Sequence, residues 1–357
     1  MKPLFAFGAA SALTAALAAC ASEPPPPDPG KLAFDEKVIA VPGFVDFLLV
    51  DGDNVWATNA TSRTEGMLEK WSTEGKLASV EMPRPCGTMA MAEGFVWQAS
   101  CPELKVYKIN AETAEIAAIL DTGLAEPSGE TNVVAGAGSV WVPSHEDGEI
   151  TRIDPKTDET VAKITVAAGT AFQAFGEGAL WAVASGESLL QRVDPQTNEV
   201  TGTVTLGDTP GFLTAGEGAV WVQEQGDGTV AKVDPETLEV IARVKVGDNL
   251  KYGDIDVADG KVWLRTTDDQ TFVVIDAKTN DILARVGRPE GSGAIRYTAK
   301  GVWTSAHDVE SINWWTPASM SADGGGESEA QDSADDSSEE MATDDAPAET
   351  DAETEAE

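Results

Sequence analysis

Positive charge is scarce in this sequence of 357 residues. It holds 24 Lys and Arg against 61 Asp and Glu, which gives a formal net charge of −37. Residues 321–357 contain 15 of the acidic residues and no basic one. Binding to a phosphate backbone needs clustered Lys and Arg that displace counterions. The charge balance therefore argues against nucleic acid as a partner.

Residues that bind metals or act as nucleophiles are also few. The chain has two histidines and three cysteines. It has no P-loop, no Gly-x-Ser-x-Gly and no clustered Cys/His spacing of a metal site. We therefore predict no cofactor from motifs, with a divalent metal as the alternative.

A long apolar run stands at the N-terminus, where residues 4–19 follow the positively charged Lys2. The run is too short and too rich in alanine for a membrane span, and it is typical of an export signal. Residues 17–20, Leu-Ala-Ala-Cys, resemble the bacterial lipobox. The resemblance implies cleavage after residue 19 and a lipid anchor on Cys20. The alternative is an ordinary secretory signal, with Cys20 incidental.

The composition divides the chain into four segments. Residues 1–19 are the predicted lipoprotein signal peptide, and residues 20–31 are a proline-rich tether that extends from the lipidated cysteine. Residues 32–317 form the predicted folded domain. Residues 318–357 are rich in acidic and small side chains and lack aromatics, so we predict a disordered tail. We thus expect an exported bacterial lipoprotein, at the outer membrane or in the periplasm.

Seven tryptophans mark an internal repeat. The strongest copies read Gly-x-Gly-x-Val/Leu-Trp, ending at Trp141, Trp181 and Trp221, and weaker copies end at the other four. Successive tryptophans are separated by 41, 44, 40, 40, 42 and 40 residues. The repeat tryptophans are Trp56, Trp97, Trp141, Trp181, Trp221, Trp263 and Trp303.

Each repeat contains four short strand signals and no helical period. The glycine before each tryptophan indicates a tight hairpin, and a later Asp-Pro-x-Thr element, as at 194–197, indicates a second turn. Four strands per unit of about 40 residues is typical of a β-propeller blade. We therefore predict an all-β, seven-bladed propeller, with the tryptophans in the core between blades.

The chain ends allow the ring to be closed. The last repeat lacks a fourth strand before the acidic tail, whereas residues 36–43 resemble a fourth strand such as 159–166. We predict that this N-terminal strand completes the last blade, which hides two open strand edges.

These repeats resemble a known class of protein. Residues 193–207, which begin Val-Asp-Pro-Gln-Thr-Asn, look like the YVTN repeat, and residues 216–222, Gly-Glu-Gly-Ala-Val-Trp-Val, look like the repeat of virginiamycin B lyase-like propellers. The resemblance covers nearly all of 32–317. It implies a seven-bladed propeller, and the lyases in this class use paired His and Glu residues with magnesium.

Function is expected on one face of the propeller. The glycine hairpins and Asp-Pro turns share a face and are short and uniform, whereas the loops on the other face vary, and variable loops on a rigid scaffold commonly bind ligands. Four residues after each Trp stand Ala60, Cys101, His145, Ser185, Gln225, Thr267 and His307. Loops leading into the innermost strands add Arg84, Glu130, Asn132, Gln173, Tyr252, Asp254, Arg288 and Arg296.

Four arginines are predicted to share the rim of this face: Arg84, Arg265, Arg288 and Arg296. In an acidic protein they suggest a local positive site for an anionic ligand. The favoured alternative is pairing with neighbouring Asp and Glu. With Gln225 and the two histidines, these arginines are the candidate ligand-binding residues.

His145 and His307 occupy the same repeat position, which suggests metal or acid–base chemistry. They belong to the third and seventh blades, on nearly opposite sides of the ring, so the lyase arrangement is not reproduced. His145, Glu146 and Asp147 are weak metal candidates by themselves, and a solvated loop is the favoured alternative.

Cys86 and Cys101 form an even pair in a chain with an export signal. If Glu93-Gly94 is a two-residue hairpin, positions whose numbers sum to 187 face each other, and these cysteines satisfy that sum. We predict a disulfide between neighbouring strands, with two reduced buried thiols as the alternative.

Two functions remain open. The first is a binding or scaffold lipoprotein that holds an unidentified protein or small molecule on its variable-loop face. The second is a metal-assisted lyase or hydrolase with a site near the central channel.

Overall fold

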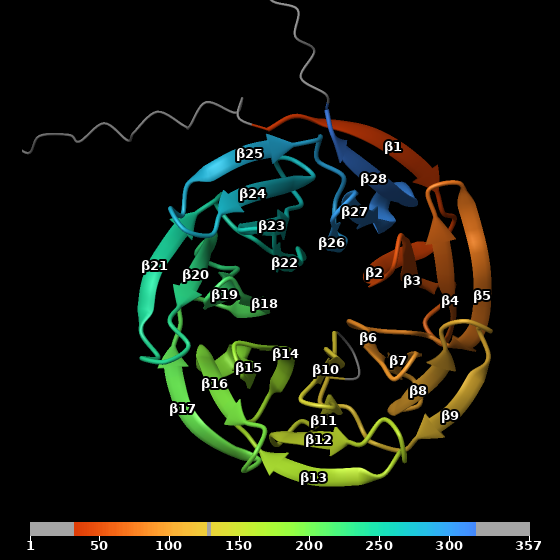
Figure 1. Cartoon of the computed structure of the whole chain (residues 1–357), viewed down its shortest axis with the longest axis vertical. Helices are drawn as coiled ribbons and strands as arrows, with labels where there is room; N and C mark the ends of the chain where they lie inside the picture. Colours follow the sequence, from red (N-terminus) through yellow and green to blue (C-terminus); the bar gives the residue numbers. More distant parts are fainter. Residues whose placement is uncertain (1–31, 127–129, 319–357) are drawn as a thin grey trace, which may run out of the picture. The chain divides into compact units, whose positions relative to one another are not determined.

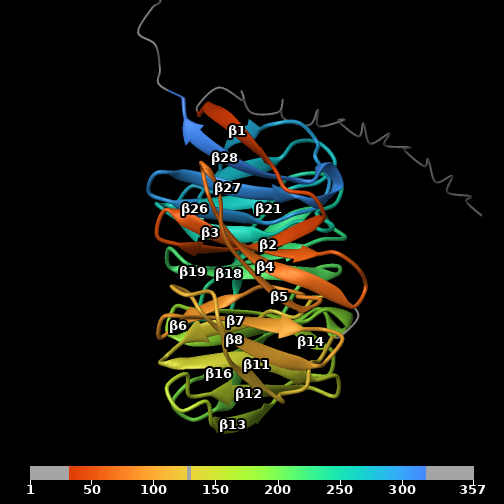
Figure 2. The same ribbon diagram turned by 90° about the vertical axis from the view of Figure 1, so that its right-hand side faces the viewer.

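The computed structural model describes residues 32–126 and 130–318, and this part of the chain is built from β-strands and two short 3-10 helices. Seven four-stranded antiparallel sheets are arranged as blades around a central axis (Figure 1). Seen from the side, the strands run across the disc from one face to the other (Figure 2). Within the described residues, no helix is long and apolar enough to cross a membrane. The predicted all-β, seven-bladed propeller is confirmed.

The strands of each blade run from the axis outward, and the first strand lies innermost (Figure 1). Blade 1 comprises β2 (Phe44–Asp51), β3 (Asn54–Ala60), β4 (Glu65–Ser72) and β5 (Gly75–Pro83). Blade 2 comprises β6 (Ala90–Ala92), β7 (Phe95–Ser100), β8 (Lys105–Asn110) and β9 (Ile116–Leu120). Blade 3 comprises β10 (Val134–Gly136), β11 (Ser139–His145), β12 (Glu149–Ile153) and β13 (Thr160–Thr165). Blade 4 comprises β14 (Thr170–Gly176), β15 (Ala179–Ala184), β16 (Leu189–Asp194) and β17 (Glu199–Thr205), with η1 (Ser185–Glu187) between β15 and β16.

The remaining blades follow the same order. Blade 5 comprises β18 (Pro210–Gly216), β19 (Ala219–Glu224), β20 (Thr229–Val233) and β21 (Val240–Lys245). Blade 6 comprises β22 (Ile255–Ala258), β23 (Lys261–Arg265), β24 (Phe272–Asp276) and β25 (Ile282–Val286). Blade 7 comprises β26 (Ile295–Thr298), β27 (Gly301–Ala306), η2 (His307–Val309), β28 (Ser311–Pro317) and β1 (Phe34–Ala40).

The repeat tryptophans form the core between blades, as predicted. Six of them have no exposed surface and Trp263 is 3% exposed. In three blades the indole N–H donates to the carbonyl of the glycine five residues earlier, for example from Trp141 to Gly136 at 3.0 Å. The glycine hairpin and the tryptophan are therefore one structural unit, because the turn provides the acceptor that a buried indole N–H requires.

A basic side chain extends this unit to the next blade. In blades 1, 2, 3 and 5 the residue paired with the Trp on the third strand is Lys or Arg and lies over the indole ring. Arg152, 4.6 Å from the Trp141 ring centre, donates to Pro195 O and to Asn198 Oδ1 at 2.5 and 2.8 Å. Each such cation thus joins the tryptophan of its own blade to the third-to-fourth-strand turn of the following blade.

The ring closes by strand exchange, as predicted. β1 pairs antiparallel with β28 from Phe34↔Pro317 to Ala40↔Ser311. At the centre of this seam, Asn313 Nδ2 donates to Glu36 Oε1 at 2.8 Å and to the buried Glu290 Oε2 at 2.9 Å. The N-terminal strand therefore completes the last sheet and covers the edge that β28 would otherwise expose.

The predicted disulfide is present. Cys86 lies in the segment between β5 and β6, Cys101 follows β7, and their Cα atoms are 5.9 Å apart. The hairpin register behind the prediction is also confirmed, because Ala92 pairs with Phe95. The bond fixes the segment that leads from blade 1 into blade 2 against the second strand of blade 2.

The predicted signal peptide at 1–19, Cys20 with the tether at 20–31, and the acidic tail lie outside the described residues, except for Ala318 at the start of the tail. The segment boundaries, the lipid anchor and the disorder of the tail stay predictions.

Candidate functional site

One layer of side chains projects from the innermost strands around the propeller axis. The layer is formed by the residue nine positions before each blade tryptophan, which the strand registers place at equivalent points of the seven blades. Its members are Phe47, Thr88, Asn132, Phe172, Phe212, Asp254 and Ala294. Phe172 packs edge-on against Phe212 with ring centres 4.8 Å apart, and Phe47 lies 5.9 Å from Phe212. Aromatic rings from blades 1, 4 and 5 therefore meet across the channel.

A cavity of about 200 Å³ opens on the variable-loop face beside this layer. We name it the mouth cavity. Blade 1 supplies three residues of β2 and two of β3, the segment after β5 supplies residues 84–87, and the loop into β10 supplies an acidic residue. The residues that matter below are Phe44, Asp46, Phe47, Arg84, Cys86 and Glu130.

Asp46 departs from the repeat. It stands ten residues before its blade tryptophan, a position that is glycine in blades 2, 5, 6 and 7 and Thr or Ala in blades 3 and 4. At Gly253 and Gly293 an added Cβ would lie 2.1 and 1.9 Å from a backbone carbonyl oxygen, so the fold there requires glycine. A charged side chain at a position that the fold keeps small indicates a role other than folding.

The carboxyl groups of Asp46 and Glu130 lie in an unfavourable environment for negative charge. Burial raises the pKa of Asp46 well above its usual range, and the nearby carboxyls of Glu130 and Asp254 raise it further. Burial, and then Asp254, raise the pKa of Glu130 to about 7. Among the described residues, no hydrogen bond or ion pair satisfies either side chain. Both residues line the cavity and are half-buried.

Arg84 is the cation of the mouth cavity. Its backbone is held between two elements, because its N–H donates to Thr64 O at 3.0 Å and its carbonyl accepts from Cys101 N at 3.3 Å. Its guanidinium is half-buried and makes no ion pair within the described part of the chain. The sequence therefore predicted a residue that does line a cavity on the expected face.

His307 lies one side chain away from the cavity. Its ring stacks on Phe44, which lines the cavity, with centres 3.8 Å apart, and its Nδ1 lies 3.0 Å from Asp308 Oδ1. Burial lowers the pKa of His307, more strongly than the Asp308 carboxylate raises it. The imidazole is thus a neutral support for the aromatic wall at neutral pH.

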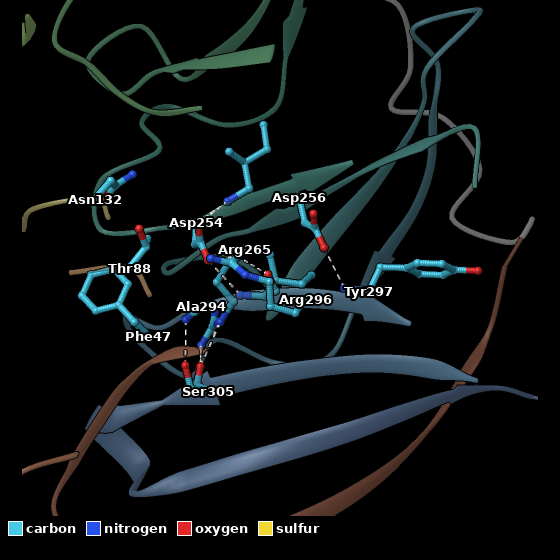
Figure 3. A network of polar contacts seen from close by, with 12 residues as sticks. Phe47, Thr88, Asn132, Asp254, Asp256, Arg265, Ala294, Arg296, Tyr297 and Ser305 are labelled. Atoms are coloured by element: carbon cyan, nitrogen blue, oxygen red, sulfur yellow. Dashed lines mark hydrogen bonds and ion pairs between the residues drawn. The ribbon is translucent and has the colours of Figure 1, made fainter. Parts of the chain in front are cut away.

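A second cavity, of about 290 Å³, occupies the channel on the other side of the aromatic layer, and Arg296, Asp254 and Asp256 line it. Arg296 donates to Asp254, which also accepts from the backbone N–H of Ile255 at 2.8 Å. Asp256 accepts from Tyr297 N at 2.8 Å (Figure 3). These carboxylates accept hydrogen bonds from backbone N–H groups on the innermost strand of blade 7. This structural role accounts for them, and no ligand is needed.

The prediction that four arginines share one rim is wrong. Arg265 has no exposed surface, and its guanidinium donates to the carbonyls of Ser305, Thr266 and Thr271, so it fastens blade 6 to blade 7 (Figure 3). Its side chain points into the interblade core because it stands two residues after Trp263 on the same strand face. Arg288 and Arg296 are paired with Glu290 and Asp254, the alternative favoured from sequence.

The other predicted residues lie away from both cavities. His145 is 59% exposed, and its Nδ1 is 3.7 Å from Asp147 Oδ2. Gln225 lies in the loop after β19 against Gly211. Blades 3 and 7, which carry the two histidines, lie in opposite parts of the ring (Figure 1). In the described residues, no group of three or more His, Cys, Asp or Glu is placed to hold a metal ion.

Sequence reasoning missed Asp46 and Phe44 and gave Glu130 no role. For Asp46 a signal existed: aligning the repeats on their tryptophans shows one aspartate in a column of small residues. Phe44, at the start of β2, and Glu130, in the loop into β10, carry no such signal, because the residues at their repeat positions vary from blade to blade.

The chain is thus a seven-bladed β-propeller with a charged cavity at one mouth of its channel. No family model and no curated protein matches it. Among solved structures, it is similar to one described as a streptogramin B lyase structure, at 14% identity and a TM-score of 0.68 over 80% of this chain and 98% of that chain.

Two further solved structures share the fold. The Cps50 (Swd1) beta-propeller domain of Myceliophteria thermophila is 13% identical with a TM-score of 0.63, over 79% of this chain and 99% of that chain. The computationally designed Ika8 protein is 13% identical with a TM-score of 0.59, over 79% of this chain and all of that chain. At such identities these likenesses establish the architecture and not the activity.

Proposed function

We propose that this protein is a binding module of the bacterial cell envelope, anchored by a lipid on Cys20, and that it holds a small ligand in the mouth cavity. The observation that carries the binding role is the set of three unpaired ionisable side chains, Asp46, Arg84 and Glu130, around one cavity on the variable-loop face. All three are half-buried, and ionisable groups that are partly removed from water without partners are costly to the fold, so they are typical of functional sites.

Export is supported by the apolar N-terminal run and by the Cys86–Cys101 disulfide, a bond that persists in oxidising compartments. The anchor is tested by replacing Cys20 with alanine in the full chain and fractionating cells. We expect the wild type in the membrane fraction and the variant in the soluble fraction. A variant that stays in the membrane fraction to the same extent contradicts a lipid on Cys20.

The binding role is tested by thermal unfolding of the full chain against a panel of small polar and charged compounds. A ligand that binds only the folded protein raises the unfolding midpoint by mass action. We expect at least one compound to raise it saturably, and Glu130→Gln to remove the rise. The exposed Asp121 is the matched control, and Asp121→Asn should leave the rise intact. A rise that persists in Glu130→Gln places the ligand elsewhere.

The second candidate is a lyase or hydrolase with a metal-assisted site near the channel. It is favoured by Glu130, because a carboxyl whose pKa is about 7 exchanges its proton readily at neutral pH, as a general acid or base must. A compound from the panel that binds and is then converted to product by wild type, but not by Glu130→Gln, supports this candidate over simple binding.

A further inference from the structure

The mouth cavity contains groups of both charge signs whose partners are missing. Asp46 and Glu130 are its carboxyls, and Arg84 is its guanidinium. No N–O pair among these three lies within ion-pair distance, so they do not neutralise one another directly. A cavity that holds two carboxyls and a separate guanidinium, without partners, complements a ligand that carries both a cationic and an anionic group.

The two carboxyls of the mouth cavity have less opposite charge around them than its guanidinium has. Around Asp46, the carboxyls of Glu130 and Asp254 oppose its ionisation, and Arg265 and Arg84 favour it. The N–H groups of Arg265 are already donated to backbone carbonyls, and Asp254 is already bound to Arg296. His307, behind Phe44, is held neutral by burial. An added cation would therefore relieve the carboxyls, whereas a pure anion would meet two of them.

The walls and the size restrict the rest of the ligand. Phe44 and Phe47 give the cavity two aromatic sides, and about 200 Å³ is the space of roughly seven liquid water molecules. Ammonium groups are also attracted to aromatic faces. This is space for a single small molecule with a short hydrocarbon part, below the usual range of about 300–1,000 Å³ for drug-sized ligands.

The second cavity, beyond the aromatic layer, has hydrogen-bonding groups of its own, which do not line the mouth cavity. Asn132, 3% exposed, belongs to the same layer as Thr88 and lines the second cavity, and its Oδ1 has no partner. In Figure 3 the Asp254 carboxyl is directed toward Arg296, to which it is bound. A buried acceptor without a donor indicates that a donor group belongs in the second cavity, and it does not bear on the ligand class of the mouth cavity.

We propose that the mouth cavity binds a small zwitterion of the amino-acid type, whose ammonium group lies between Asp46 and Glu130, whose carboxylate lies on Arg84 and whose hydrocarbon part lies against Phe44 and Phe47. The inference rests on the proposed binding role and names the chemical class of its ligand. The chain's net charge of −37 agrees with it, because a field of that sign repels free anions more than zwitterions.

Three matched compounds test the inference on the full chain: leucine, isopentylammonium, which lacks the carboxylate, and 4-methylpentanoate, which lacks the ammonium group. We expect leucine to bind with the lowest Kd by titration calorimetry, at least about tenfold below either analogue, the value of one charge-assisted hydrogen bond. Binding of leucine should also release protons, measured in buffers of different ionisation enthalpy, because the ammonium favours the ionised carboxyls.

The variants separate the two ends of the ligand. Asp46→Asn and Glu130→Gln should weaken leucine and isopentylammonium about tenfold or more and leave 4-methylpentanoate unchanged. Arg84→Gln should weaken leucine and leave isopentylammonium unchanged. The exposed residues Asp121 and Arg63 provide matched controls, and Asp121→Asn and Arg63→Gln should bind all compounds as the wild type does. If Asp46→Asn fails to fold, Asp46→Gly, the residue of four other blades, replaces it.

The outcomes distinguish this inference from the binding role on which it rests. Equal binding of leucine and 4-methylpentanoate, or equal Kd values in wild type and Asp46→Asn, overturns the zwitterion. A neutral or anionic compound that binds in a Glu130-dependent manner, without any binding of leucine, overturns the zwitterion and keeps the binding role. If no compound of any charge binds, both are overturned.

Discussion

At the scale of residues, the mouth cavity shows how a repeat protein separates what the fold needs from what a ligand needs. The seven blades give seven versions of each position. At many positions the blades carry the same kind of residue, as they do at the buried tryptophans. Asp46 disagrees with its column, and it lies in the cavity beside Glu130. Such departures cost stability, because they bury charge, and the cost is measurable.

Glu130 should make the stability of the propeller depend on pH. Its pKa is about 7 in the folded chain and near 4.5 when unfolded, so the folded state holds the proton more tightly. The stabilisation is complete below about pH 4.5 and is lost as the pH rises through 7. By linkage, the wild type should lose about 2 to 3 kcal/mol more than Glu130→Gln between pH 5 and pH 8 in urea unfolding. Equal losses in both proteins would show that Glu130 titrates normally.

At the scale of elements, two devices hold the blades in place. The first is the cation that joins a tryptophan to the turn of the next blade, as Arg152 does. The second is the disulfide, which occurs where the segment after β5 carries cavity residues. The first device accounts for the basic residue opposite the tryptophan, and the second accounts for the even cysteine pair. Both are contacts between neighbouring elements.

Removing the disulfide should lower the stability of the fold. The bond joins residues 15 apart, and closing a loop of this length is worth about 3 kcal/mol in the chain-entropy account. We therefore expect Cys86→Ala/Cys101→Ala to lower the free energy of unfolding by about 2 to 3 kcal/mol in urea. Reducing agent should have the same effect on the wild type and none on the double variant. A wild-type protein that is insensitive to reductant while its thiols react would contradict a stabilising role.

At the scale of the whole molecule, closure by β1 makes the propeller cooperative. Blade 7 is completed by the strand that comes first in the described chain, and the seam carries the Asn313 bonds to Glu36 and Glu290. Burial and the Glu290 carboxylate raise the pKa of Glu36, and Arg288 opposes this. The last sheet therefore cannot be completed until both ends of the ring meet.

Deleting residues 34–40 from the full chain should open this seam. The deletion removes seven paired positions between β1 and β28, and at about 0.5 to 1 kcal/mol per net hydrogen bond the loss is on the order of 3–7 kcal/mol. The exposed edge of β28 should also promote self-association, seen by light scattering. Deletion of residues 319–357 is the control and should change neither the unfolding midpoint nor the oligomeric state. A β1 deletion as stable as this control would contradict closure by strand exchange.

The sequence by itself determined the architecture of this protein. The regular spacing of the tryptophans, with glycine hairpins before them, set the number of blades, because each blade needs one large core residue at one place. The strand at the N-terminus and the missing strand at the other end predicted closure, and the hairpin register predicted the Cys86–Cys101 bond. The blade count and the disulfide depend on local hairpin pairing, and closure follows from counting the strands that each repeat needs.

Only the tertiary structure decided the site. Asp46 belongs to β2 of blade 1, whereas Arg84 and Glu130 come from the segments that lead into blades 2 and 3. They meet because the ring brings the starts of the inner strands to one mouth. The same packing buries Arg265, which sequence alone placed on the rim. The direction of a side chain near the axis depends on how neighbouring blades fit together, and that fit is a property of the closed ring rather than of any single repeat.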